Sequence, residues 1–252
     1  MPSQNTAIAV IDLGDFSRPE VQRSAARFAQ RKLGGQPLIV RMARRLSECT
    51  LVDQVFIVGS NIPSSLLTSG IAGIRTFNLP SLNACERICT ATDNCKADWV
   101  VYVPANRPFV DSTLVDRLLA RAMKAKDCDY VGYGSDAGDT RRADHLGLAG
   151  EVCHADTLRR LRRNADRFPT VDGSSIATWL ETAPGAYHLI FMPVPPALDR
   201  SDLRFAIEDE LDWDDAELLC DTVSDEDSQW QELSQLVIAN RDLRQSMETR
   251  NR

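Results

Sequence analysis

Residues 99–111, with the sequence WVVYVPANRPFVD, constrain the fold of this chain more than any other stretch. The apolar and β-branched residues at 99–103 predict a buried strand, which Pro104 ends. The short polar loop Ala105-Asn106-Arg107 follows, and Asp111 is placed to cap a helix whose apolar residues recur at helical spacing. Open α/β sheets bind ligands between the carboxyl end of a strand and the amino end of the next helix. The stretch therefore predicts an α/β fold with a binding site at residues 105–107.

Strand-like and helix-like segments alternate along the rest of the chain. The pattern predicts strands at residues 6–12, 54–59, 73–77, 129–134, 146–152 and 187–192. It predicts helices at residues 37–47, 82–94, 156–165, 174–181, 212–222 and 228–246, and one that starts at 112. Repeated strand-then-helix units with short links favour a mostly parallel central sheet with helices on both faces. We expect one domain over residues 1–252, in which residues 136–200 form an excursion that begins with a polar loop.

Composition narrows the class of protein. With 43% hydrophobic and 26% charged residues, the chain has the composition of a folded globular protein. Its net charge of −7 argues against a general nucleic-acid binder, and no apolar run approaches the roughly 20 residues that span a bilayer. The first residues are typical of a strand rather than a signal peptide, and the cysteines contain no C-x-x-C pair. These features predict a cytoplasmic protein with reduced structural thiols; a metal cluster at Cys85, Cys89 and Cys95 is the alternative interpretation.

Gly34 and Gly35 stand between a loop and a predicted helix, in the segment LGGQPL. Paired glycines allow a backbone to pass close to a ligand, and a helix start offers unpaired N–H groups. The same pair is also typical of a simple turn before a helix that starts at a proline. Because neither G-x-G-x-x-G nor G-K-[ST] follows the first strand, a dinucleotide-binding oxidoreductase is the least favoured class.

Several segments occur in an order that carries a family resemblance. They are KLGGQPLIVRMARRL, LVDQVFIVGS, LNACERICTA and ADWVVYVPANRPFVDSTLVDRLL, then the more distant GLAGEVCHADTL and LRFAIED. Over residues 6–222 this layout resembles the nucleotidyltransferases of spore-coat polysaccharide biosynthesis, relatives of the synthetases that make CMP-activated acidic sugars. That family typically shows L-G-G-K-P-L, V-x-[IL]-T-G-D-x-P-[LF]-[IV]-D, G-x-x-x-E-V-F-x-x-x-x-L and L-R-[WL]-T-V-D-T-P-E-D.

The resemblance implies a GT-A-like nucleotidyltransferase sandwich that transfers a cytidylyl or other nucleotidyl group from a nucleoside triphosphate, CTP being favoured, to a sugar. Mg²⁺ would neutralise the triphosphate, and pyrophosphate would leave. The sugar would lie toward residues 140–190, and the excursion would build a homodimer; neither nucleic acid nor a membrane is expected as a partner. The implied nucleotide-binding residues are Leu13, Gly14, Gly34, Gly35, Asn83, Ala105 and Asn106. The implied metal ligands are Asn106 and Glu208, and the implied catalytic residues are Arg18 and Arg87.

The chain departs from the family pattern at charged positions. Asn106 and Asn83 stand where the family has aspartates, although Arg87 is retained, and Glu208 replaces the aspartate of T-V-D. An amide offers a hard cation only a neutral carbonyl, and the longer glutamate moves its carboxylate by about 1 Å. The family's arginine loop after the first strand is not readable, so no motif places the cations of this segment, Arg18, Arg23, Arg27, Arg31 and Lys32.

Structural roles compete with these functional ones. Asn106 could cap the turn that follows it, and residues 209–215 could be an acidic helix start favoured by the helix dipole. A second hypothesis follows, in which the fold is kept but catalysis is impaired and the protein binds a nucleotide, a sugar or another protein.

Overall fold

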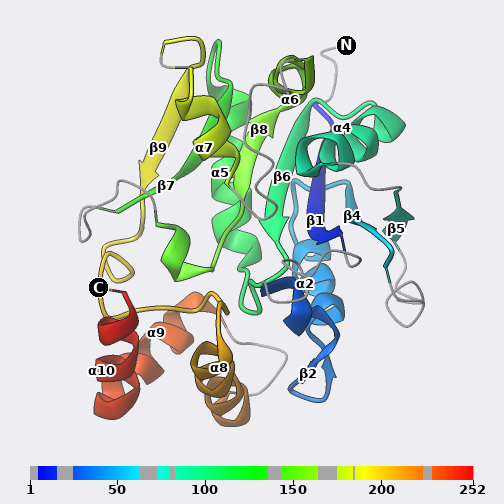
Figure 1. Ribbon diagram of the computed structural model, residues 1–252. Coiled ribbons are helices and arrows are strands. Elements are labelled where there is room, and N and C mark those ends of the chain that lie inside the picture. Colours follow the sequence, from blue (N-terminus) through cyan, green and yellow to red (C-terminus); the bar gives the residue numbers. More distant parts are fainter. Residues whose placement is uncertain are drawn as a thin grey trace.

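A seven-stranded sheet runs through the centre of the molecule (Figure 1). The computed structural model describes residues 5–15, 25–62, 73–79, 83–135, 143–163, 175–183, 185–223 and 229–251. The strands are β1 (Ala7–Asp15), β4 (Gln54–Ser60), β5 (Ile74–Asn78), β6 (Trp99–Pro104), β7 (Tyr130–Gly134), β8 (Glu151–His154) and β9 (Leu189–Pro193). Their order is β5-β4-β1-β6-β8-β7-β9, and neighbours are parallel except where β8 pairs antiparallel with β6 and β7. The expected mostly parallel sheet is confirmed.

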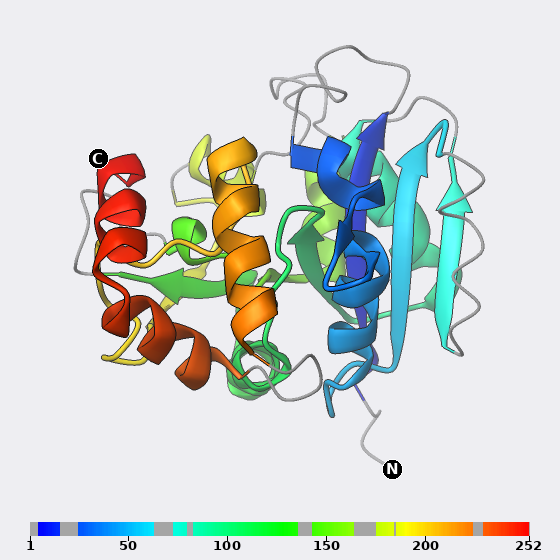
Figure 2. The ribbon, with the colours of Figure 1, turned by 90° about the horizontal axis from the view of Figure 1, so that it is seen from below.

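Helices cover both faces of this sheet, as expected. One core joins the sheet to α2 (Leu38–Ser47), α5 (Ser112–Lys124), α8 (Glu210–Thr222), α9 (Trp230–Ala239) and α10 (Arg241–Arg250). The other core joins it to α4 (Ala84–Cys95), α6 (Ala155–Arg163) and α7 (Ile176–Glu181). Short 3-10 helices occupy η1 (Ala25–Gln30) and η2 (Asp144–Leu146). In Figure 2, α8 lies between α10 on one side and the segment from β2 to α2 on the other.

Alternation along β1 explains the two cores. Ile8 and Val10 belong to one core, Ala9 and Ile11 to the other, and each of these side chains is fully buried. Successive strand residues point to opposite faces, so a strand that is apolar at every position must be covered on both. The ends of β1 and β6 are therefore the places where polar chemistry is possible.

The glycine pair forms a hairpin turn. Gly34 and Gly35 join β2 (Lys32–Leu33) to β3 (Gln36–Pro37), which pair antiparallel, and their φ angles are +57° and +81°. Two successive positive φ angles are the signature of a tight two-residue hairpin, which glycine adopts without strain. Pro37 is extended within β3, so the predicted helix starts at Leu38 rather than at Pro37. The turn interpretation of this pair is confirmed.

Two other predicted boundaries were wrong. The strand expected at 146–152 begins only at Glu151, because Gly147 has a φ of +63° and passes against the chain at Ala206. A Cβ at Gly147 would lie 2.5 Å from the Ala206 backbone nitrogen. The helix expected at 228–246 is two helices, since Asn240 leaves helical geometry and its Oδ1 accepts a hydrogen bond from the Leu243 N–H at 3.1 Å.

The segment 136–200 supplies β8 and β9, so part of it completes the central sheet. Its first residues, 136–142, lie outside the described part of the chain. Its expected roles in sugar binding and dimerisation stay predictions. Among the residues that the structure describes, no helix is both long and apolar enough to cross a membrane.

A buried ion pair ties α4 to β1. The Arg87 guanidinium donates to both carboxylate oxygens of Asp12, from Nε at 2.8 Å and from Nη2 at 2.9 Å. Both side chains are almost wholly buried, at 0% and 2% exposure. Such a pair is fully satisfied in place, but either partner alone would be a buried, uncompensated charge.

We expect Arg87→Met to lower the free energy of unfolding by about 3–5 kcal/mol, because the Asp12 carboxylate would remain buried without its partner. Urea denaturation at neutral pH measures this loss. Adding Asp12→Asn to Arg87→Met should restore most of it, and Arg121→Ala, at an exposed position of α5, is the control. A loss below about 1 kcal/mol for Arg87→Met would contradict the assignment.

Candidate functional site

A cavity of about 200 Å³ lies at the carboxyl ends of β6 and β7. The loop after β6 and strand β7 form one side, and the antiparallel β8 brings its first residue, Glu151, to the same edge. Residues 143–151 and the connector after β9 form most of the remaining wall. Glu208, from the segment before α8, also lines it. The cavity therefore opens where the sequence predicted a ligand site.

Asn106 lies on this wall and is anchored through its backbone. Its carbonyl oxygen accepts a hydrogen bond from the Ile207 N–H at 2.9 Å. The side chain is 7% exposed, and its Oδ1 is buried without a hydrogen-bond partner. Since this oxygen accepts nothing, the side chain does not cap the following turn through it. Asp111 does cap the next helix, as predicted, with its Oδ1 accepting from the N–H groups of Thr113 and Leu114.

Glu208 follows the residue that is bonded to Asn106. The structure thus brings together the two residues that the sequence predicted as metal ligands, and both line the same cavity. The Glu208 side chain is 59% exposed, and its Oε2 accepts from Arg204 Nη2 at 2.8 Å. Asp209 is the N-cap of α8, and its Oδ1 accepts from the Asp212 N–H at 2.9 Å. The predicted acidic helix start at 209–215 is therefore confirmed, and Glu208 immediately precedes it.

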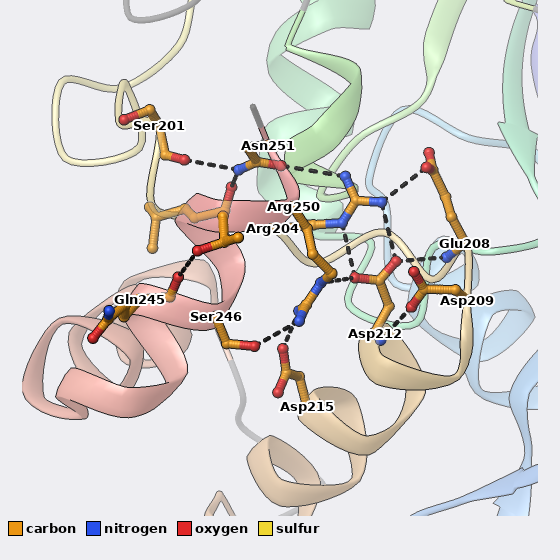
Figure 3. A network of polar contacts seen from close by, with 12 residues as sticks. Ser201, Arg204, Glu208, Asp209, Asp212, Asp215, Gln245, Ser246, Arg250 and Asn251 are labelled. Atoms are coloured by element: carbon orange, nitrogen blue, oxygen red, sulfur yellow. Dashed lines mark hydrogen bonds and ion pairs between the residues drawn. The ribbon is translucent and has the colours of Figure 1, made fainter.

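A network from the C-terminal helix fixes this segment (Figure 3). Asp212 is 4% exposed and accepts from Arg204 Nε at 2.8 Å, from Arg250 Nε at 3.0 Å and from the Glu208 N–H at 2.9 Å. Asn251 adds contacts to Arg204 and to the backbone at Ser201 and Leu203. No pattern in the sequence indicates this role of α10, because only tertiary structure brings residues 250–251 to the segment before α8.

The floor of the cavity holds a buried carboxylate that the sequence analysis also missed. Glu151 accepts from the Tyr130 hydroxyl at 2.7 Å, from the Ser175 hydroxyl at 2.5 Å and from the N–H groups of Ile176 and Ala177. The signal was present, since Glu151 is the glutamate of GLAGEVCHADTL and matches the glutamate of the family motif. These bonds hold α7 against β8 and make this wall rigid.

A second tyrosine on the wall is neutral at ordinary pH. Burial raises the pKa of Tyr133 to about 12. Its hydroxyl donates to the Leu114 carbonyl at 3.1 Å. The cavity therefore combines neutral polar groups with the carboxylates of Glu151 and Glu208 and the guanidinium of Arg107.

The predicted nucleotide-binding residues lie apart from this cavity, except Asn106. Leu13 and Gly14 end β1, where Gly14 has a φ of +70° and its N–H donates to Asp12 Oδ1 at 3.1 Å. Ala105 is buried beside Asn106. Asn83 is the N-cap of α4, and its Oδ1 accepts from the Glu86 N–H at 2.9 Å. Gly34 and Gly35 form the exposed hairpin turn described above.

The predicted catalytic arginines have different positions. Arg87 is enclosed in its ion pair with Asp12 and reaches no surface. Arg18 lies outside the described residues. Both assignments stay predictions, and the geometry of Arg87 shows a structural role.

The donors available to a divalent cation are oxygen atoms of Asn106 and Glu208. Among the described residues, no group of three or more His, Cys, Asp or Glu side chains could hold a metal ion. The alternative interpretation of Cys85, Cys89 and Cys95 as a metal cluster is therefore wrong. The unpartnered Oδ1 of Asn106 and the carboxylate of Glu208 fit Mg²⁺ as hard donors, but they bring only one negative charge. These two side chains alone would leave most coordination positions of such a cation to other ligands.

Comparison with known proteins identifies the family. The MobA-like NTP transferase domain matches residues 28–194, well over half of the chain. The chain belongs to this family. The matched region contains Arg87, Asn106 and the strands around the cavity, and it ends before Glu208. The match does not show the spore-coat nucleotidyltransferase family that the sequence motifs resemble. No curated protein matches the chain.

Solved structures of low sequence identity share the fold. A cytidylyltransferase from Leptospira borgpetersenii has a TM-score of 0.75 at 15% identity, over 95% of this chain and 97% of its own. CMP:2-keto-3-deoxy-manno-octonic acid synthetase complexed with CTP has a TM-score of 0.57 at 11% identity, over 86% and 99%. Molybdopterin-guanine dinucleotide biosynthesis protein A from Archaeoglobus fulgidus has a TM-score of 0.59 at 17% identity, over 86% and 100%. The architecture is thus that of a nucleotidyltransferase.

The network at Asp212 should make stability depend on pH. Burial alone would raise the pKa of Asp212, but hydrogen bonds from Arg204 and the Glu208 N–H, with the charges of Arg204 and Arg250, lower it below its ordinary 3.8. The stabilisation is therefore present above the unfolded-state pKa and is lost as the pH falls through the lower, folded-state pKa.

We expect Asp212→Asn to be less stable than the wild type at pH 7, with the gap closing as the pH falls below about 4. Urea denaturation at a series of pH values from neutral to acid measures the free energy of unfolding of both proteins. Asp221→Asn, an exposed change on the same helix, should run within about 0.5 kcal/mol of the wild type throughout. If the difference in the free energy of unfolding between Asp212→Asn and the wild type does not change with pH, the Asp212 carboxylate gives the network no pH-dependent stabilisation.

Proposed function

We propose that the protein is a cytoplasmic sugar nucleotidyltransferase of the spore-coat polysaccharide type, which transfers a cytidylyl group from CTP to a sugar for surface polysaccharide synthesis. The observation that carries this proposal is the cavity beside Asn106 and Glu208 at the carboxyl edge of the sheet. Its position agrees with the place where open α/β sheets bind ligands. A homodimer built by residues 136–200 belongs to the same proposal.

The cavity suits the acceptor sugar. Its volume of about 200 Å³ is below the range of roughly 300–1,000 Å³ that is usual for ligand pockets, so it fits a small molecule and not a nucleotide as well. Part of its wall, from Ala143 to Ser175, comes from residues 140–190, the region expected to face the sugar. The nucleotide would then lie toward Leu13, Gly14 and Ala105, on the β1 side of Asn106.

In the reaction, a sugar oxygen attacks the α-phosphorus of CTP and forms a new P–O bond. The bond between the α-phosphorus and the bridging oxygen to the β-phosphate breaks, and pyrophosphate leaves with that electron pair. A hydroxyl acceptor also releases its proton to solvent, whereas a carboxylate acceptor has none to release. Negative charge must be neutralised along the triphosphate throughout.

Asn106 and Glu208 would hold Mg²⁺, which when bound neutralises phosphate charge. The chain's own residues supply the rest. Arg107 brings a cation to the cavity wall. The Glu151 carboxylate, which already accepts from Tyr130, Ser175 and two backbone N–H groups, fixes the shape of that wall. The C-terminal network holds the Glu208 backbone, so the ligand pair keeps its place.

A second candidate function is binding without catalysis. The observation that favours it is the charge of the ligand pair, since Asn106 is neutral and the Glu208 carboxylate is already in contact with Arg204 at 2.8 Å. In this case the protein would bind a nucleotide, a sugar or a protein partner through the same architecture.

Calorimetric titration separates the two candidates. We expect CTP to bind in the presence of Mg²⁺, EDTA to weaken this binding, and addition of a sugar acid to release pyrophosphate. Binding that EDTA leaves unchanged, or an absence of binding, would favour the second candidate. GTP is the matched competitor, because one structural relative is named for a guanine dinucleotide.

We expect Asn106→Asp to raise turnover, because a second carboxylate strengthens the grip on a hard cation. We expect a gain of about 10-fold or more, because changes to residues that only support metal ligands already alter activity by about 10–100-fold. Pyrophosphate release with saturating CTP measures it. Asn94→Asp is the matched control, since Asn94 is an exposed asparagine of α4 that does not line the cavity. Background activity in Asn106→Asp would exclude Asn106 as the limiting group.

A further inference from the structure

Two arginines of the segment before the glycine hairpin converge on one carboxylate of α8. Arg27 Nη2 lies 3.3 Å from Glu210 Oε1, and Arg31 Nη1 lies 2.5 Å from Glu210 Oε2. Each carboxylate oxygen is thus taken by a different guanidinium. The arrangement is a ready anion-binding site whose present occupant is a side chain of the protein itself.

Aromatic rings hold the two guanidiniums in place. Phe28 and Trp213 are buried and stacked, with ring centroids 5.5 Å apart and an interplanar angle of 12°. The Arg31 guanidinium lies 4.0 Å from the Trp213 ring, and that of Arg27 lies 4.6 Å from the Phe28 ring. Guanidiniums stacked on aromatic faces lose little freedom when they bind an anion, because the rings have already oriented them.

The carboxylate that they hold is exposed. The Glu210 side chain is 60% exposed, against 35% and 41% for Arg27 and Arg31. An exposed ion pair contributes little to stability, so a stronger anion can displace the glutamate at small cost. The arginines would keep their aromatic support after the exchange.

The position of this cluster links it to the cavity. Glu210 follows Glu208, which lines the cavity, by two positions, and β2 at the end of the arginine segment contacts α8. Figure 2 shows α8 next to this segment. An anion held by Arg27 and Arg31 would therefore lie on the same edge of the sheet as Asn106 and Glu208.

We propose that Glu210 is a built-in competitor for the triphosphate site. Its carboxylate holds Arg27 and Arg31, two cations of the segment where the family has its arginine loop, until the terminal phosphates of the nucleoside triphosphate displace it. Phosphate and carboxylate oxygens both accept charge-assisted hydrogen bonds from guanidinium N–H groups, and a triphosphate brings more charge. Glu210 thus competes with the nucleotide for two cations that no sequence motif places. The inference rests on the proposed function for the identity of the ligand.

The test uses calorimetric titration of the full chain with inorganic tripolyphosphate and with CTP, at low salt. We expect Glu210→Gln, which removes the competing charge, to tighten tripolyphosphate binding by about threefold or more. Arg27→Gln combined with Arg31→Gln should weaken it by about tenfold or more. Glu210→Gln leaves the aromatic stack intact, so its gain does not depend on how well the double variant folds.

Asp93 offers a matched control, because it also accepts from two arginines, Arg159 and Arg162, of α6. Asp93→Asn and the double change of Arg159 and Arg162 to glutamine should leave both affinities within about twofold of the wild type. If these control changes act as strongly as those at Glu210, Arg27 and Arg31, the effect is one of net charge and the inference fails.

The two ligands separate this inference from the proposed function. If the wild type transfers the nucleotidyl group but the Glu210, Arg27 and Arg31 variants bind tripolyphosphate and CTP as the wild type does, the inference is wrong and the proposed function stands. Tripolyphosphate binding that depends on these residues, with no binding of CTP or GTP, would overturn the proposed function alone. If neither the wild type nor Glu210→Gln binds tripolyphosphate, the inference is wrong.

Discussion

Burial of β1 and β6 on both faces is the constraint on which the rest of this structure depends. Each strand packs apolar side chains against helices above and below along most of its length, and the Asp12 carboxylate near the end of β1 is buried only because Arg87 pairs with it. Function is confined to the loops where these strands end. In the loop after β6, the Asn106 carbonyl accepts a backbone hydrogen bond from Ile207, which joins this loop to the segment before α8.

The C-terminal helices complete the site although they lie beyond the part of the chain that matches the family. Asp212 accepts from two arginines that belong to different segments, and the same carboxylate holds the backbone of Glu208. A carboxylate with this many donors is positioned by all of them together. The cavity wall is thus set by residues close to the end of the chain.

Much of the fold could be predicted from the sequence, because the strands are continuous apolar runs and the helices are amphipathic. The antiparallel direction of β8 could not, since a short strand between loops reads the same in either direction. The break at Asn240 was missed because the apolar spacing continues across it, and only the side-chain cap on Leu243 ends the helix. The pairing of Asn106 with Glu208 followed from family motifs, whereas the positions of Glu151, Arg250 and Glu210 depend on contacts between distant segments that no local pattern encodes.

The lone Oδ1 of Asn106 has a consequence for selectivity. Burying a carbonyl oxygen without a hydrogen-bond donor destabilises the folded state by roughly 1–3 kcal/mol, and Asn106 Oδ1 is buried in this way. Only a hydrogen-bond donor or a cation relieves that cost, while a bare oxygen would be repelled. A group that reached this oxygen would therefore have to carry a hydrogen-bond donor or a positive charge, whatever its shape.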